Sequence, residues 1–310
     1  LNASRRSLIR KQHMMLVRFM HLPRHIIRLL LLAFVPLSGL AVPPLDTPAK
    51  TSYSGIYELP VRLNDGLYEG EPLVQGGASR PRIELLTDLH INSGDNTFVL
   101  LNESSGGTGN NLYLAAVSPA GDNTGTVLIG DRVDVISLTS EGNRVMLEYV
   151  TAGPGEPACC PTLRVTGTYG MENGKLVEQS RQVHGSISLA TLSGTQWRLL
   201  EIARDTPVPD DSSITAIFDD TRISGSAGCN RYFADLSAPT PYELSIGPAG
   251  ATRMACPPPL MELETLYLKA LENATQFSFR LGRLMIDYRD SDMPATLQFE
   301  RLVPEQEASQ

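Results

Sequence analysis

The chain has 310 residues, of which 42% are hydrophobic, and it carries 26 Lys and Arg against 34 Asp and Glu, a net charge of −8. This length is enough for two ordinary domains, each with its own core. Seven of the basic residues and no acidic residue lie in residues 1–41, so the rest of the chain has 19 basic and 34 acidic side chains, a net charge of −15. An acidic chain without a basic cluster argues against nucleic acids and anionic membranes as partners.

Residues 1–41 have the layout of a secretory signal peptide. A basic segment precedes a short apolar stretch that is interrupted by Pro36 and ends in small residues at Gly39 and Ala41. This stretch is shorter than the ~20 apolar residues of a transmembrane helix. We therefore expect cleavage near Ala41, export to the periplasm or the extracellular space, and no membrane span after cleavage. Two alternatives stay open: an uncleaved signal that anchors the protein, and a twin-arginine signal, "SRRSLIRK", at residues 4–11.

Residues 42–54 have no apolar periodicity and are predicted to be a tether. Residues 55–187 are predicted to form a first β-rich domain, because β-branched or leucine-rich runs alternate there with turn sequences rich in Gly, Asn and Asp. This spacing favours an antiparallel sheet or barrel. The expected strands are "PRIELL", "NTFVLL", "NLYLAAV", "GTVLIG", "RVDVISL", "NRVMLEYV" and "LRVTGTYGM".

A second β-rich domain is predicted for residues 188–303, followed by a polar tail at 304–310. Its expected strands are "TQWRLLEI", "SITAIF", "TRISGS", "YELSIG", "FSFRL", "RLMIDYR" and "ATLQFERL". Residues 258–273 instead have helical spacing after a run of prolines, with an apolar face made of Leu260, Leu263, Leu266, Tyr267, Ala270 and Leu271. The predicted fold class is therefore mainly β or α+β, two β-rich domains with one helix packed on a sheet of the second.

The segment "SGSAGCN", residues 224–230, places Cys229 after a run of tiny side chains. Ser, Gly and Ala let the backbone approach a neighbour closely, and Gly228 permits a sharp bend. Cys256 lies where a loop enters the predicted helix, and the cysteines of an exported protein meet an oxidising compartment. We therefore predict a structural Cys229–Cys256 disulfide; the alternative is two buried free thiols.

Residues 189–303 resemble a META domain, the module of the heat-inducible HslJ proteins of bacterial envelopes. The resemblance is carried by "LSGTQWRLLEI", "SITAIFDDTRISGSAGCNRYFADL", "LSIGPAGATRMACPPPLMELETLYLKAL" and "ATLQFERL", in that order. It implies a compact, mainly β antiparallel fold with one packed helix and no established catalytic activity, linked loosely to heat stress, envelope integrity and drug tolerance. Within this fold we expect Trp197 to be a core aromatic and Asn230 to be a bend residue.

The first domain contains two adjacent cysteines, Cys159 and Cys160, in "PACCPT". We expect them to form a vicinal disulfide; the alternative is a bend in which one of them pairs elsewhere. The segments "NSGDNTFVLL", "SSGGTGNNLYLAAV", "GDRVDVISL" and "CCPT" are also similar to a module of uncharacterised exported bacterial proteins, some of them lipid-anchored.

The sequence predicts no catalytic residue, cofactor or metal ligand. After residue 41 the only histidines are His90 and His184, and neither lies in a nucleophile motif such as G-x-S-x-G. The aspartate pairs Asp210-Asp211 and Asp219-Asp220 lie between predicted strands, where Asp is an ordinary turn residue. The cysteines are adjacent or isolated, which does not fit a zinc site.

One loop has a faint likeness to a calcium-binding frame. Residues 88–96 carry oxygen-bearing side chains at Asp88, Asn92, Asp95 and Asn96, but His90 and Ser93 occupy ligand positions and the bidentate Glu of the frame is missing. The predicted structure is a polar hairpin loop, with a calcium-stabilised domain as the alternative.

The sequence thus favours an exported, non-enzymatic envelope protein that acts as a binding or protective module, with an unknown envelope protein or a small ligand as partner. An inhibitor of an envelope enzyme or peptidase, acting through the loop "APTPYE" at residues 238–243, is the first alternative. A calcium-stabilised binding protein is the second. An enzyme that uses His90 or His184 is the third.

Overall fold

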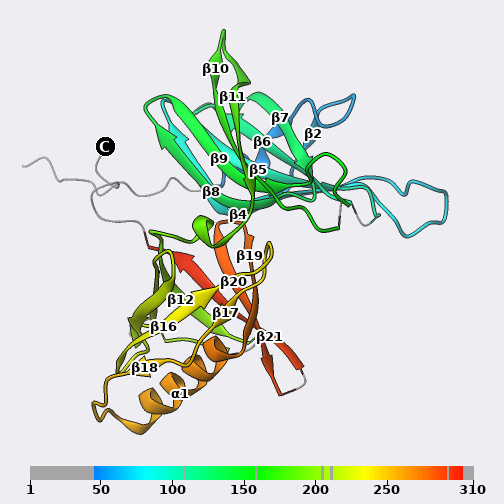
Figure 1. The fold of residues 1–310 in the computed structure, drawn as a ribbon. Coiled ribbons are helices and arrows are strands. Elements are labelled where there is room, and N and C mark those ends of the chain that lie inside the picture. Colours follow the sequence, from blue (N-terminus) through cyan, green and yellow to red (C-terminus); the bar gives the residue numbers. More distant parts are fainter. Residues whose placement is uncertain are drawn as a thin grey trace, which may run out of the picture. The chain divides into compact units, whose positions relative to one another are not determined.

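A computed structural model describes residues 45–302 except 108, 158, 204–205, 210–211 and 292. The predicted signal peptide, the first residues of the predicted tether, the Asp210-Asp211 pair and the polar tail lie outside the described residues. The compact unit that starts at Val42 is mostly antiparallel β, with one α-helix in its described part (Figure 1). This confirms the predicted fold class. No helix in the described residues is long and apolar enough to cross a membrane.

The N-terminal β region contains a five-stranded sheet in the order β3-β4-β5-β6-β7 and a four-stranded sheet in the order β11-β10-β9-β8 (Figure 1). The two sheets meet where β4 contacts β8 and where β7 contacts β11. The strands are β3 Leu67–Glu69, β4 Arg82–Ser93, β5 Asn96–Ser104, β6 Asn111–Val117, β7 Asn123–Asp131, β8 Asp134–Glu141, β9 Arg144–Thr151, β10 Leu163–Glu172 and β11 Lys175–Ser186.

Strand β5 is buried on both faces, because alternate side chains of a strand point to opposite sides. Phe98 and Leu100 join the core between the two sheets. Val99 and Leu101 face a second core on the other side of the five-stranded sheet. The neighbouring strand β6, "NLYLAAV", is an unbroken apolar run for the same reason.

The second core is covered by the chain that precedes β3. This segment forms a short 3-10 helix, η1 Pro48–Lys50, and a two-stranded sheet of β1 Ser52–Tyr53 and β2 Val61–Arg62. The Tyr53 side chain is fully buried, and its hydroxyl donates a hydrogen bond to the Pro48 carbonyl at 2.9 Å. From Leu45 onward, the segment predicted as a tether is therefore packed structure. An analysis of apolar periodicity does not detect this segment, because single buried side chains such as Tyr53 hold it in place and no regular apolar pattern is present.

Several strands differ from the sequence prediction, and among them the long strand β11 was not expected. Strand β4 continues to Ser93, so most of the predicted polar loop at residues 88–96 is strand. The pairing of β4 with β5 shifts between Leu86 and His90, and this bulge turns Asp88 toward Arg283, 3.5 Å away. Strand β16 was not predicted, although its side chains alternate regularly between exposed and buried.

The C-terminal β region is a 10-stranded antiparallel sheet with the main order β17-β16-β15-β14-β12-β21-β20-β19. A second 3-10 helix, η2 Leu189–Thr191, precedes it. The strands are β12 Gln196–Ile202, β13 Thr206–Pro207, β14 Thr215–Phe218, β15 Arg222–Ser226, β16 Arg231–Ser237, β17 Ser245–Ile246, β18 Gly250–Ala251, β19 Ala274–Arg280, β20 Arg283–Asp290 and β21 Met293–Arg301.

Helix α1, Pro258–Glu272, lies against this sheet where the sequence predicts a helix (Figure 1). It begins with prolines, which suit the first turn because its backbone N–H groups have no partner within the helix. Tyr267, Ala270 and Leu271 are buried as expected. Leu266 was assigned to the same face but is 52% exposed, because the buried stripe is narrower than the apolar pattern.

Aromatic side chains fill the core under the helix. Trp197 is 1% exposed, its ring lies 6.0 Å from that of Phe279, and its indole N–H donates to the Thr195 hydroxyl at 2.7 Å. Tyr267 meets Tyr232 edge to face at 5.5 Å. A buried Trp with its N–H bonded contributes apolar area without leaving an unpaired polar group.

The two buried tyrosine hydroxyls form a chain. The hydroxyl oxygens of Tyr232 and Tyr267 are 2.7 Å apart, and the Tyr232 hydroxyl donates to the Thr215 carbonyl at 3.1 Å. Tyr267 must therefore donate to Tyr232. Burial raises the pKa of both phenols, so both keep their protons.

These contacts predict unequal costs for removing the two hydroxyls. Tyr232→Phe should lower the free energy of unfolding by about 1–3 kcal/mol, because it leaves the Tyr267 hydroxyl buried without a partner. Tyr267→Phe should cost about 1 kcal/mol or less, because Tyr232 keeps its bond to Thr215. Urea denaturation of both variants measures the difference; equal costs, or the reverse order, would contradict the chain.

Candidate functional site

The "SGSAGCN" segment and the start of α1 are joined covalently. Cys229 and Cys256 form a disulfide with their Cα atoms 6.0 Å apart, and Cys229 is buried. Gly228 has a φ of +105°, which side chains rarely permit, and a Cβ there would lie 2.9 Å from the Leu260 side chain. The tiny residue before Cys229 thus allows both the bend and the close approach of the helix.

Asn230 holds the same junction through hydrogen bonds. Its backbone N–H and side-chain amide donate to the two carboxylate oxygens of Glu264, at 2.6 and 2.9 Å. Its side-chain oxygen accepts from the Met254 backbone N–H at 2.7 Å and from the Thr252 hydroxyl at 2.8 Å. Asn230 is therefore more than the predicted bend residue: it connects three segments of the C-terminal region.

The adjacent cysteines lie side by side on the surface. Cys159 and Cys160 are exposed, and their sulfur atoms are 2.6 Å apart, which is longer than a disulfide bond but shorter than the contact between two unbonded sulfur atoms, so the vicinal disulfide stays a prediction. Neighbouring Cα atoms lie about 3.8 Å apart, closer than the ~4.4–6.8 Å that a disulfide normally spans, so a bond between these two residues would be strained.

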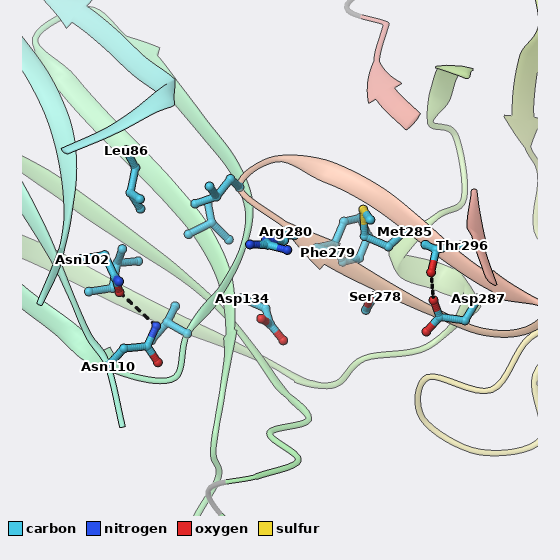
Figure 2. A pocket seen from close by; sticks show the side chains of 14 residues that line it. Leu86, Asn102, Asn110, Asp134, Ser278, Phe279, Arg280, Met285, Asp287 and Thr296 are labelled. Atoms are coloured by element: carbon cyan, nitrogen blue, oxygen red, sulfur yellow. Dashed lines mark hydrogen bonds between the residues drawn. The ribbon is translucent and has the colours of Figure 1, made fainter. Parts of the chain in front are cut away.

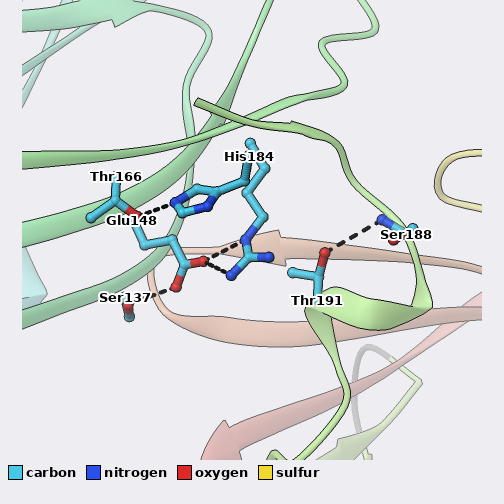
Figure 3. A network of polar contacts seen from close by, with 7 residues as sticks. Ser137, Glu148, Thr166, His184, Ser188 and Thr191 are labelled. Carbon is cyan, nitrogen blue, oxygen red and sulfur yellow. Dashed lines mark hydrogen bonds and ion pairs between the residues drawn. The ribbon is translucent and has the colours of Figure 1, made fainter. Parts of the chain in front are cut away.

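The two histidines have different surroundings. His90 lies on β4, and its ring nitrogen Nδ1 is 3.3 Å from the Thr87 carbonyl oxygen. His184 lies on β11 and contacts the Thr166 hydroxyl at 2.8 Å on an exposed surface (Figure 3). The two histidines lie on strands of different sheets.

Three of the four calcium-like residues, Asp88, Asn92 and Asn96, have protein partners. Asp88 pairs with Arg283, and the Asn92 side-chain oxygen accepts from Thr97. Asn96 accepts from Thr124. Within the described ranges, no group of three or more His, Cys, Asp or Glu could hold a metal ion.

Asp219 and Asp220 lie in the turn between β14 and β15, as expected. Asp220 accepts a hydrogen bond from the Ser193 hydroxyl at 2.6 Å. The "APTPYE" loop is held at Tyr242, whose hydroxyl donates to the Pro161 carbonyl and whose own carbonyl accepts from the Phe277 backbone N–H at 2.8 Å. Residues 239–241 of that loop are exposed.

The sequence did not predict a pocket of about 410 Å³ that is lined by both β regions. Asp134 at the start of β8 and Arg280 at the end of β19 lie at its centre, near Ser278 (Figure 2). Leu86 and the bonded pair Asn102–Asn110, with 2.9 Å between nitrogen and oxygen, line one end. Phe279, Met285, Asp287 and Thr296 line the other.

Burial raises the pKa of Asp134 to about 6, and the positive charge of Arg280 counteracts part of this rise. The carboxyl therefore titrates close to neutral pH. Titratable groups with such shifts, when they face a cavity, are characteristic of functional sites. The sequence contained only a weak signal for this site, since Asp134 is a single acidic residue before an apolar run. Its partner Arg280 is distant in the chain.

A second pocket, of about 500 Å³, begins at the neighbouring residues. Val135 and Leu281 line the first pocket, whereas Ile136 and Gly282 line the second. Glu148 is the acidic side chain of the second pocket, and it accepts from Arg164 at 2.5 Å and from the Ser137 hydroxyl at 3.4 Å (Figure 3). Glu148 is therefore engaged in an ion pair with Arg164, a residue that is not part of this pocket's lining.

Comparison with known proteins relates the C-terminal β region to a protein family. Residues 190–301 match the META domain family. This chain contains a META domain. The match confirms the resemblance seen in residues 189–303 and places Trp197, the Cys229–Cys256 disulfide and α1 within the META domain.

Two solved structures are similar to part of the chain. An NMR structure of a protein from Burkholderia xenovorans is 27% identical, covering 37% of this chain and 87% of that chain, with a TM-score of 0.31. A second NMR structure of a protein is 24% identical, covering 37% of this chain and 94% of that chain, also with a TM-score of 0.31. No curated protein matches the chain.

The disulfide should stabilise the META domain by closing a loop of 27 residues. The chain-entropy relation gives about 3.5 kcal/mol for a loop of this length. Cys229→Ala together with Cys256→Ala should therefore lower the free energy of unfolding by this order in oxidising buffer, measured by guanidinium denaturation. In reductant the same variant should match the reduced wild type; an equal loss in both buffers would show that packing, and not the cross-link, is responsible.

Asp134 should make stability depend on pH in a defined direction. An unfolded Asp has a pKa near 3.9 and the folded carboxyl one of about 6, so the folded state binds the proton more tightly. The stabilising effect of this group is complete below about pH 4 and is lost as the pH rises through about 6. Asp134→Asn should remove this dependence and raise the free energy of unfolding at pH 7 by about 1–2 kcal/mol.

Denaturation at several pH values measures this effect. The positive charge near Asp134 is that of Arg280, and the phenol of Tyr242 from the "APTPYE" loop stays neutral because burial raises its pKa. Asp235→Asn, at an exposed position of β16, is the matched control and should change the free energy of unfolding by less than about 0.5 kcal/mol. A destabilised Asp134→Asn variant at pH 7 would contradict the expected cost of the buried charge.

Proposed function

We propose that this is an exported, non-enzymatic protein of a bacterial envelope that binds a small ligand in the pocket between β8 and the β19–β20 hairpin of the META domain. Asp134 carries the proposal. Its carboxylate is held in a half-buried position where ionisation is unfavourable, and its neighbour Arg280 offsets only part of that cost. A bound cation would supply the missing compensation.

The side chains around Asp134 indicate the ligand class. Asp134 offers a carboxylate and Arg280 a guanidinium in one pocket, and Leu112 and Phe279 add apolar surface. A carboxylate binds ammonium groups and a guanidinium binds carboxylates. We therefore assign the pocket to a small zwitterion with an apolar side chain, such as a free amino acid or the end of a short peptide.

Three observations support export and a stable, protective role. The predicted signal precedes an acidic chain, and a buried disulfide cross-links the META domain. Disulfides persist in oxidising compartments outside the cytosol. A protein that works there without chaperone refolding depends on such a cross-link to remain folded.

Leucine tests the pocket directly, with two analogues as controls. Leucine methyl ester keeps only the ammonium and N-acetylleucine only the carboxylate. If Asp134 binds the ammonium group and Arg280 binds the carboxylate, leucine at saturating concentration should raise the melting temperature by several degrees. Each analogue should raise it less. Asp134→Asn and Arg280→Gln should each abolish the shift, whereas Asp235→Asn should preserve it. Equal shifts for all three compounds, or a shift that survives both substitutions, would contradict this binding mode.

Export is tested separately by the intact mass of protein recovered from the periplasm or the medium. A mass that begins near Val42 supports cleavage at the predicted signal. An unprocessed chain retained in the cytosol would overturn the envelope role and leave the pocket assignment standing.

A further inference from the structure

Cys159 and Cys160 lie next to each other at the surface of the N-terminal β region. Cys159 and Cys160 are both exposed, and their sulfur atoms approach to 2.6 Å. The two side chains therefore point toward each other, as a disulfide bond of about 2.05 Å between them requires. In the described part of the chain, the other two cysteines are already bonded to each other.

Glu156 organises the loop that presents these thiols. Its carboxylate accepts from the backbone N–H groups of Gly153 and Thr162, at 2.8 and 2.9 Å, and from the Thr162 hydroxyl at 2.5 Å. These donors lower the pKa of Glu156, which stays ionised. The carboxylate thus closes the base of the loop on both sides of the cysteines.

The end of the loop is attached to the META domain. The Pro161 carbonyl, directly after Cys160, accepts the hydrogen bond from the Tyr242 hydroxyl. Burial raises the pKa of Tyr242, so this phenol remains a donor. The residue after Cys160 is thus hydrogen-bonded to the "APTPYE" loop.

Covalent geometry makes a bond between these two cysteines reversible. Adjacent Cα atoms are about 3.8 Å apart, whereas disulfides usually span ~4.4–6.8 Å. A bond across the shorter distance is strained, and strained or exposed disulfides are the ones that are readily reduced. Cys229 and Cys256, with 6.0 Å between their Cα atoms and Cys229 buried, have neither property.

We propose that Cys159 and Cys160 are a thiol–disulfide exchange site that reacts with low-molecular-weight disulfides such as glutathione disulfide. The thiolate of one cysteine attacks the reagent's sulfur–sulfur bond, forming a mixed disulfide and releasing one small thiolate. The neighbouring thiol loses its proton and attacks the protein sulfur of the mixed disulfide, which releases the second small thiolate. In total, two protein thiols and one small disulfide become one protein disulfide and two small thiols, with two electrons transferred to the reagent.

The equilibrium is measured in buffers of varied ratios of reduced to oxidised glutathione, followed by alkylation of free thiols and intact-mass analysis of the full chain. The wild type should change from two alkylated cysteines to none as the oxidised fraction rises, without accumulating a glutathione adduct. Peptide mapping should place both alkylated residues in the loop and find Cys229–Cys256 bonded throughout.

Single variants separate exchange from simple modification. Cys160→Ser and Cys159→Ser should each trap the glutathione adduct, because the resolving thiol is missing. The double Ser variant should show neither alkylation nor adduct, and its folding is checked by the same melting curve as the wild type. Stable adducts on the wild type, disulfide-linked dimers, or no oxidation at any ratio would each overturn the proposal.

Discussion

The turn between β19 and β20 meets β8 through a backbone hydrogen bond of 2.9 Å from the Gly282 N–H to the Val135 carbonyl. Residues on the two sides of this bond line different pockets. Both residues of the turn have positive φ, +51° at Leu281 and +79° at Gly282, as a two-residue hairpin turn of this class requires. Glycine adopts this conformation freely, whereas leucine there is strained by an amount on the order of 1 kcal/mol. In this strained conformation, Leu281 lines the first pocket and Gly282 forms the hydrogen bond to β8.

Two carboxylates, those of Asp134 and Glu156, show how the surroundings of a group change its pKa in opposite directions. Asp134 is half-buried with partial compensation from Arg280, and its pKa rises to about 6. Glu156 is a carboxylate on a surface loop whose pKa falls, because three protein donors bond its charged form. Asp134 can therefore exchange a proton or accept a cation near neutral pH, while Glu156 keeps its charge and orders a loop.

The four cysteines divide into two kinds for an equally simple reason. Cys229 and Cys256 are distant in sequence and are brought within an ordinary disulfide span by the fold. Cys159 and Cys160 are adjacent in sequence, and covalent geometry keeps their Cα atoms too close for an unstrained bond. The first pair cross-links the META domain, and the second lies exposed on the surface, where a bond between the two residues would be strained.

Much of the fold was determined by the sequence alone, because it depends on local patterns. Alternating apolar runs predicted most strands, a helical repeat after prolines predicted α1, and the "GCN" and "TRMACP" segments identified the META domain. Tertiary structure decided the contacts between residues that are distant in sequence, which local patterns do not contain. Tyr53 and the segment around it are ordered by burial against a distant sheet, and the bulge in β4 aims Asp88 at Arg283. Asp134 acquires its raised pKa only where β8 and β19 meet, since desolvation depends on neighbours that lie far away in the chain.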